Sequence, residues 1–156
     1  MKTNAVRTLD QQKIAYRLIP YEVDESDLSG ETVAKKIGLA PERVFKTLAA
    51  KGDKTGVLLA VIATPQTLDL KALAAVSGNK SCELLPLKEV LPVTGYIRGG
   101  VSPIGTKKRF PVYLDEAARS LDEISISAGM RGLQVLLSPG DLARVTGATW
   151  SVVGKR

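Results

Sequence analysis

The sequence predicts an α+β fold, in which one domain carries a mixed, mostly antiparallel, barrel-like sheet with flanking helices. The chain has 156 residues, of which 44% are hydrophobic, enough for one buried core but too few for two complete domains. Strand-like apolar runs occur in closely spaced pairs, which indicates hairpins, and capped helical segments lie between them. A single domain is therefore expected over residues 1–156.

The N-terminal segments predict a helix, an edge strand and a second helix. Asn4 can cap a short amphipathic helix, and residues 14–22 then read as a strand. Pro20 interrupts that strand and lacks an N–H, so an edge or bulge position is expected. Ser29 marks the cap of the second helix, and Gly38 marks its end.

The middle of the chain predicts a hairpin whose second strand is buried. Pro41 opens a short helical turn that runs directly into a strand at residues 45–50. Residues 57–63, VLLAVIA, form an unbroken apolar run typical of a strand covered on both faces. The segment between the strands, KGDKTG, contains two glycines and predicts an antiparallel hairpin with a longer loop.

The second half of the chain predicts three helices and three further strands. Thr67 and Asp69 begin a helix that Gly78 ends, and a short helix is expected at residues 87–91 between two prolines. A glycine-rich loop covers residues 94–109. The last elements are strands at 111–115, 123–129 and 133–138, the last two forming a hairpin, then a helix at 141–147 capped by Ser138 and a tail at 149–156 that packs Trp150 onto the body.

Composition excludes many classes of enzyme. The chain has no histidine and one cysteine, Cys82, which removes Ser-His and Cys-His pairs and every histidine or multi-cysteine metal site. No calcium-loop or phosphate-loop motif occurs, so no metal and no cofactor is expected. The net charge of +6 favours a polyanionic partner. Without a signal peptide or a membrane-length apolar run, a cytoplasmic location and no membrane partner are expected.

The residue pattern leaves three candidate features open. Strand alternation places Lys46 on one face with Leu48 and Ala50, where the ammonium either snorkels to water or lines a cleft, and the pattern alone favours snorkelling. The Gly99-Gly100 pair allows a backbone to approach a ligand closely, but it serves a tight turn equally well. Residues 107–109, KKR, are either a phosphate-binding surface or a solvated charge run.

Five segments together resemble the YbaK family. They are Tyr21 and the runs at 44–48 (VFKTL), 64–74 (TPQTLDLKALA), 94–111 (TGYIRGGVSPIGTKKRFP) and 127–143 (SAGMRGLQVLLSPGDLA). Members of this family are free-standing aminoacyl-tRNA deacylases, similar to the editing domain inserted in bacterial prolyl-tRNA synthetases. The resemblance implies that domain's fold and a mischarged tRNA as substrate, typically cysteine on the proline tRNA.

The resemblance also implies roles for individual residues. The essential lysine of the family falls on Lys46, and the substrate's own thiol is thought to attack its ester, so that the enzyme supplies orientation and oxyanion donors. We predict catalytic roles for Lys46 and the amides of Gly99 and Gly100. Substrate binding is predicted for Tyr21, Thr47, Ser102, Ser127 and Gln134, and tRNA binding for Lys107, Lys108, Arg109 and Arg131.

One departure from the family pattern affects specificity. Gln134 stands where the best-known branch has an aspartate, and an amide cannot pair with a substrate ammonium as a carboxylate does. Removal of alanine or another small residue is therefore an alternative to removal of cysteine. A non-catalytic tRNA- or synthetase-binding module and a hydrolase of other esters are further alternatives. Prolyl-tRNA synthetase is a candidate partner, and the sequence leaves the oligomeric state open.

Overall fold

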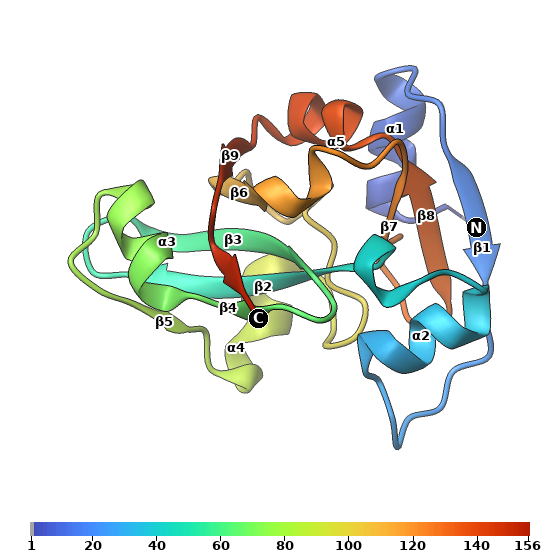
Figure 1. Cartoon of the computed structure of the whole chain (residues 1–156), viewed down its shortest axis with the longest axis horizontal. Helices are drawn as coiled ribbons and strands as arrows, with labels where there is room; N and C mark the ends of the chain where they lie inside the picture. Colours follow the sequence, from blue (N-terminus) through green and yellow to red (C-terminus); the bar gives the residue numbers. More distant parts are fainter. Residues whose placement is uncertain (1) are drawn as a thin grey trace.

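The computed structural model describes residues 2–156, which form two larger sheets, a two-stranded ribbon and helices around them (Figure 1). Within this range no helix has the length and apolar character needed to cross a bilayer. The helices are α1 (Asn4–Gln11), α2 (Gly30–Ile37), α3 (Leu70–Ser77), α4 (Leu87–Thr94) and α5 (Pro139–Thr146), with 3-10 turns η1 (Pro41–Arg43) and η2 (Glu116–Ala118).

The larger sheet is mixed and has the order β5-β2-β3-β6-β9, while the smaller has the antiparallel order β1-β8-β7. Only the β3–β6 and β6–β9 pairs are parallel, so the prediction of a mixed, mostly antiparallel sheet is confirmed. The strands do not close into a barrel; a single bridge from Val44 to Ser125 links the two sheets. The strands are β1 (Arg17–Pro20), β2 (Phe45–Gly52), β3 (Gly56–Ala63), β4 (Thr67–Leu68), β5 (Cys82–Leu84), β6 (Val112–Asp115), β7 (Ile124–Ser127), β8 (Leu133–Leu137), β9 (Thr149–Ser151) and β10 (Gly154–Lys155).

Side-chain caps begin α1, α2, α3 and α5 close to the predicted positions, whereas Pro86, which precedes α4, offers no side-chain cap. The hydroxyl or carboxylate of Ser29, Asp69 and Ser138 accepts a hydrogen bond from the N–H three residues on. Thr67, which was expected to begin α3 together with Asp69, lies in β4. For α1 the prediction of Asn4 is wrong: Thr3 is the cap, and its Oγ1 accepts from the Val6 N–H at 3.2 Å. The edge position predicted from Pro20 is confirmed, because β1 pairs only with β8.

Three features differ from the sequence-based expectation. α4 continues through Pro92, because the hydrogen bond from Thr94 Oγ1 to the Val90 carbonyl at 2.7 Å and that from the Gly95 N–H to the Leu91 carbonyl at 2.9 Å hold its last turn. The β2–β3 turn is tighter than predicted, since pairing continues to the glycines of the turn. The short strands β4, β5, β9 and β10 were not predicted; Trp150 lies in β9, under the Arg119 guanidinium at 4.3 Å.

Strand β3 is buried on both faces, as its continuous apolar run predicts. Leu59 and Val61 belong to the main hydrophobic core, which also contains side chains from α1, α5, β7 and β8. Leu58, Ala60 and Ile62 face a second, smaller core that includes Leu73 of α3. The hairpin of β2 and β3 is thereby held rigidly between two cores, and β2 is positioned beside it.

Candidate functional site

One stretch of β2 pairs with another strand on one side only. On the side away from β3, β5 pairs only with Ala50–Gly52, and the Leu85 N–H donates to the Ala49 carbonyl at 3.0 Å. At the other end, Val44 bridges β7. Between these contacts, no strand among residues 2–156 pairs with the β2 segment 45–48 on that side, which we call the open edge.

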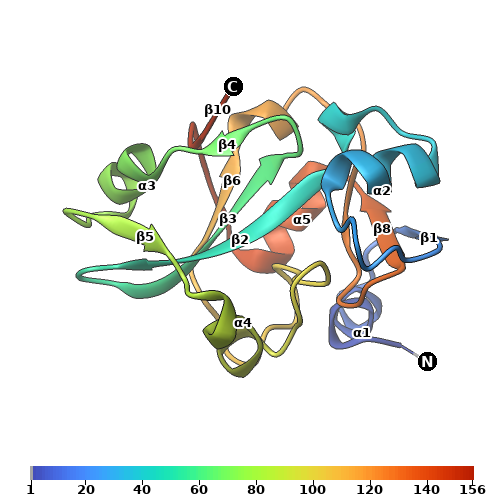
Figure 2. The same ribbon diagram turned by 90° about the horizontal axis from the view of Figure 1, so that it is seen from below.

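A cavity of about 670 Å³ lies against the open edge. Consecutive residues 45–49 all line it, which means that the strand presents its edge as well as its faces. The other walls come from four separate segments: residues 26–31 before and within α2, residues 84–90 of β5 and α4, the loop residues Arg98, Gly99 and Val101, and Ser127 with Gln134 from β7 and β8. Figure 2 shows α4 and this loop on one side of β2, with α2 and β8 beside its far end.

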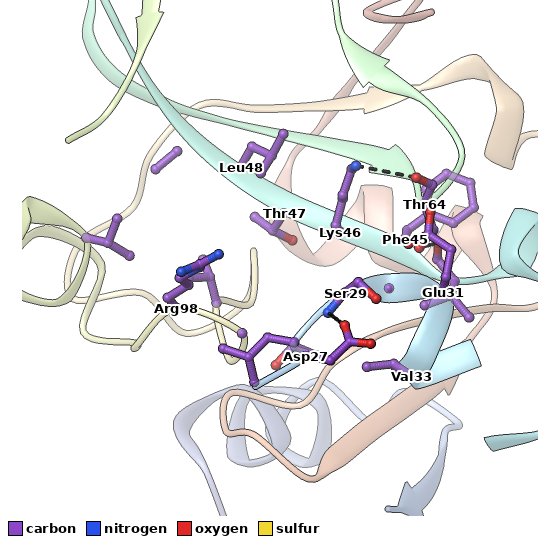
Figure 3. Close-up of a pocket in the computed structure, with 18 of the residues that line it drawn as sticks. Asp27, Ser29, Glu31, Val33, Phe45, Lys46, Thr47, Leu48, Thr64 and Arg98 are labelled. Atoms are coloured by element: carbon purple, nitrogen blue, oxygen red, sulfur yellow. Dashed lines mark hydrogen bonds between the residues drawn. The ribbon is translucent and has the colours of Figure 1, made fainter. Parts of the chain in front are cut away.

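Lys46 is half-buried and points from β2 toward the end of β3 (Figure 3). Its Nζ donates to the Thr64 carbonyl at 3.4 Å, and no carboxylate in residues 2–156 forms an ion pair with it. Thr64 is buried and fixed by its own hydrogen bond to Val44. α2 packs closely here, since a Cβ on Gly30 would lie 2.3 Å from Thr64 Oγ1. The ammonium is therefore positioned by rigid elements but is free to bind an anion or a carbonyl.

Thr47 presents unused polar groups to the open edge. Its Oγ1 is buried and has no hydrogen-bond partner in the described structure. In a strand, backbone groups of residues two apart point to the same side, and the Ala49 carbonyl points away from β3 toward Leu85. The Thr47 N–H and C=O therefore also point to the open side. A buried hydroxyl without a partner costs about 1–3 kcal/mol, so a ligand that satisfies it gains affinity.

The glycine loop contributes Gly99 but not Gly100. Gly99 has a left-handed φ of 84° and lines the cavity, while the Arg131 Nε donates to the Arg98 carbonyl at 2.8 Å and holds the loop. The Gly100 N–H is already bonded to the Ile97 carbonyl at 2.8 Å, and Gly100 does not line the cavity. Of the two amide donors predicted, only the N–H of Gly99 remains a candidate in this cavity.

The wall opposite α4 is polar and uncharged. Gln134 is 5% exposed, and its Oε1 accepts from Ser125 Oγ at 2.7 Å. Ser127 Oγ accepts from the Gly129 N–H at 3.1 Å. We call Ser127 and Gln134, which both line the cavity, the polar wall. A hydroxyl or thiol fits such a wall better than a charged group, because no counter-charge is present on it.

The remaining predicted residues do not line this cavity. Tyr21 packs with Val33 under α2, and Ser102 is fully buried and accepts from the Ile104 N–H at 3.2 Å, a structural role within its loop. The basic run lies elsewhere: the Lys108 ammonium is 5.5 Å from the Phe110 ring, and Arg109 lines a second cavity of about 190 Å³. Of the predicted residues, the cavity brings together Lys46, Thr47, Gly99, Ser127 and Gln134.

Several lining residues were not predicted as site residues. Arg98 rises from its loop toward β2 in Figure 3, and only its place in the 94–111 motif could have indicated it. Ser29 was interpreted solely as a helix cap. Asp27 accepts hydrogen bonds from the Thr32 hydroxyl and the Ser29 N–H, and these bonds lower the pKa of its carboxyl. No cluster of metal-binding side chains occurs in residues 2–156.

Comparison with known proteins places these features in a family. The family model described as "Aminoacyl-tRNA editing domain" matches residues 26–145. The "Putative Cys-tRNA(Pro)/Cys-tRNA(Cys) deacylase EbsC" of Enterococcus faecalis is 47% identical over 97% of this chain and 93% of its own length. The "Multifunctional Ser/Thr-tRNA deacylase ProXp-y" of Escherichia coli K12 is 28% identical over 90% of this chain and 84% of its length.

A solved structure has the same fold. It is described as a "putative trans-editing enzyme for prolyl tRNA synthetase" and superposes with a TM-score of 0.87 at 23% identity, covering 100% of this chain and 99% of its own. At that identity the likeness concerns the fold alone. The family-model match extends from the segment before α2 into α5 and so includes every segment that lines the cavity. The chain belongs to the aminoacyl-tRNA editing domain family.

Proposed function

We propose that this protein is a trans-editing aminoacyl-tRNA deacylase that removes a wrongly attached amino acid from tRNA, with cysteine on the proline tRNA as its main substrate. The observation that carries the proposal is the open edge of β2, where Lys46 and Thr47, whose hydroxyl is unpartnered, both line one cavity. The names of the relatives, a Cys-tRNA deacylase and a Ser/Thr-tRNA deacylase, support the same activity.

The lining residues suggest how the ester is held. The Lys46 ammonium binds an oxygen of the ester or of the terminal ribose and its phosphate. The Gly99 N–H donates to the ester oxygen as negative charge develops on it, and loss of one such donor typically costs about 3 kcal/mol. The Thr47 carbonyl at the open edge accepts from the α-ammonium of the amino acid. Orientation by these groups lowers the barrier without a protein nucleophile.

The nucleophile is the thiol of the cysteinyl substrate. A bond forms between the sulfur and the ester carbonyl carbon, the bond from that carbon to the ribose oxygen breaks, and the thiol proton passes to the released ribose oxygen, which becomes a hydroxyl group. The products are free tRNA and a cyclic thioester, which water then opens. This route agrees with the composition of the chain, because the enzyme itself needs no histidine or cysteine nucleophile.

The polar wall favours a second substrate class. The Gln134 amide and the Ser127 hydroxyl can form hydrogen bonds with the hydroxyl of a bound amino acid as well as with a thiol. Seryl and threonyl esters are therefore candidate substrates alongside cysteinyl esters. Removal of alanine is a further alternative, although its methyl group would leave the polar wall unsatisfied. Contact with the tRNA phosphates is proposed for Lys107, Lys108, Arg109 and Arg131, and prolyl-tRNA synthetase is proposed as a partner that supplies the mischarged tRNA.

A panel of charged tRNAs tests the proposal. The purified protein is mixed with proline tRNA carrying cysteine, S-methylcysteine, serine, alanine or proline, with and without prolyl-tRNA synthetase. We expect fast loss of cysteine, little loss of S-methylcysteine because its sulfur cannot be deprotonated, and no loss of proline. Loss of every ester at the spontaneous rate, despite tRNA binding, would instead identify a non-catalytic binding module.

A further inference from the structure

Two exposed leucines line the cavity, and a third lies on the same helix as one of them. Leu84 of β5 is 52% exposed, and Leu87 and Leu91 of α4 are 60% and 51% exposed. Leu87 and Leu91 are four residues apart and so share one face of α4. Leu84 and Leu87 both line the cavity. We call these three side chains the leucine rim; single exposed leucines are ordinary, but a group beside a site indicates a ligand.

The two ends of the cavity differ in chemistry. The polar wall belongs to β7 and β8, whereas the leucine rim belongs to β5 and α4, and the open edge of β2 lies between them. Figure 2 shows α4 below the middle of β2 and β8 beyond the far end of the strand. With the ester held at Lys46 and Gly99 and the amino-acid side chain against the polar wall, the nucleoside must leave toward the opposite end.

We propose, on the basis of the proposed function, that the leucine rim binds the terminal adenine base of the tRNA. Only one ribose separates that base from the ester, so the base has to lie within one nucleoside of the open edge. The flat apolar faces of a purine suit exposed aliphatic side chains, which gain by being covered. The Arg98 side chain, which lines the same cavity and rises toward β2 in Figure 3, is available to the phosphate of the same nucleotide.

The size of the rim favours a base over a protein partner. A stable protein interface covers roughly 800 Å² on each partner, far more than three leucine side chains provide. Exposed, charged residues interrupt the apolar surface, with Glu83 before Leu84 and Lys88 after Leu87. A planar ring the size of adenine can cover the rim without burying those charges.

The test is a cycle that combines a variant with a modified substrate. Deacylation of Cys-tRNA(Pro) by wild type, Leu87→Ser and Leu84→Ser is compared with that of the same tRNA ending in a ribose without a base. We expect a five- to tenfold decrease in kcat/KM from either change alone, and little further decrease when both are combined, because they remove the same contact. Leu18→Ser is the matched control, since Leu18 is 41% exposed on β1 and does not line the cavity.

Other results would overturn the proposal. If the decreases in kcat/KM from the variant and from removal of the base multiplied when combined, the rim and the base would not be in contact. An unchanged wild-type kcat/KM on the tRNA without the base would lead to the same conclusion. A Leu87→Ser variant impaired only in the presence of prolyl-tRNA synthetase would mark the rim as a protein interface. If wild type deacylates no tRNA, the proposed function fails, and the same cycle measured as tRNA dissociation constants still decides whether the rim binds the base.

Discussion

The two ends of β2 differ in how completely their polar groups are satisfied. At the end near the β2–β3 turn, pairing with both β3 and β5 is reinforced by the buried side chain of Asn79, whose Oδ1 accepts from the N–H groups of Lys54 and Thr55 at 2.8 and 3.0 Å. The Asn79 amide group donates to the hydroxyls of Thr55 and Ser77. We call this the closed end.

At the open edge, by contrast, the strand has no pairing partner on one side, and the Thr47 hydroxyl is buried without a hydrogen-bond partner in residues 2–156. The same strand is thus rigid at one end and unsatisfied at the other. Stability and ligand binding are therefore separated along β2. The closed end and the flanking cores hold the open edge in place, and the unsatisfied groups of the open edge remain available to bind a substrate. The following substitutions test that separation.

The largest effect is expected for Lys46→Ala at the open edge. We expect deacylation of Cys-tRNA(Pro) to slow by about 100- to 1000-fold, because a charge that binds the reacting ester or its ribose is lost. The free energy of unfolding should change by less than about 0.5 kcal/mol, since Lys46 makes no ion pair with any residue in 2–156. Lys51→Ala, an exposed lysine at the closed end of the same strand, is the matched control and should keep full activity. Equal rates for the two variants would refute the assignment.

Asn79→Ala should have the opposite profile. It leaves two backbone N–H groups without their partner and removes one hydrogen bond from each of the Thr55 and Ser77 hydroxyls, so we expect a loss of about 2–4 kcal/mol in the free energy of unfolding, measured with urea. The folded fraction should retain most of its deacylation rate. Asn4→Ala, at an exposed asparagine on α1, is the control for the amide itself. A stable but inactive Asn79→Ala protein would contradict the separation.

Tyr96 provides a pH-dependent test of the loop that carries Arg98 and Gly99. The side chain is 6% exposed and donates to the carbonyl of Ile104 at 2.7 Å, and burial raises the pKa of its hydroxyl to about 12. The native state therefore holds the proton more tightly than the unfolded state, so the stabilisation is complete below about pH 10 and is lost as the pH rises toward 12. The stability advantage of wild type over Tyr96→Phe should shrink by up to about 2 kcal/mol across that range. An advantage independent of pH would contradict this.

The smallest effect is expected for Thr47→Val. Replacing the unpartnered hydroxyl by a methyl group removes an unsatisfied polar atom, so stability should stay equal or rise by up to about 1 kcal/mol. Deacylation should slow by about tenfold, because the substrate loses a hydrogen-bond partner. Thr149→Val, at an exposed threonine in β9, controls for the change of residue type. Decreased stability together with unchanged activity would mean that the hydroxyl serves the fold instead.

Helix ends and the buried hairpin were predictable because their signals are local. The caps at Ser29, Asp69 and Ser138 each bond to an N–H three residues away. The continuous apolar run at 57–63 indicates by itself that the strand is buried on both faces. The strand β5 was not predictable, because its three residues become a strand only through pairing with Ala50–Gly52. The continuation of α4 past Pro92 likewise depends on a side-chain hydrogen bond that propensity does not reveal.

The candidate site was predictable only in part, for a related reason. Lys46 and Thr47 could be identified from the family resemblance, but their alternation on β2 could not show that one edge of that strand is uncovered. Arg98 and the leucine rim reach the cavity from other segments, so only the three-dimensional arrangement places them there. The basic run at 107–109, predicted to bind tRNA phosphates beside the site, does not line the cavity, and its role stays a prediction.

The location of the editing site can be tested most directly by NMR. The backbone amide signals of the protein are followed while a stable substrate analogue is added. The analogue is adenosine whose 3′ oxygen is replaced by an amide-linked cysteine, which the enzyme cannot cleave. We predict saturable shifts of the Thr47 and Gly99 signals at the open edge and none at Lys51 or Asp53 at the closed end. Shifts that leave Thr47 and Gly99 unmoved and concentrate on another surface would contradict the claim that the open edge of β2 is the editing site.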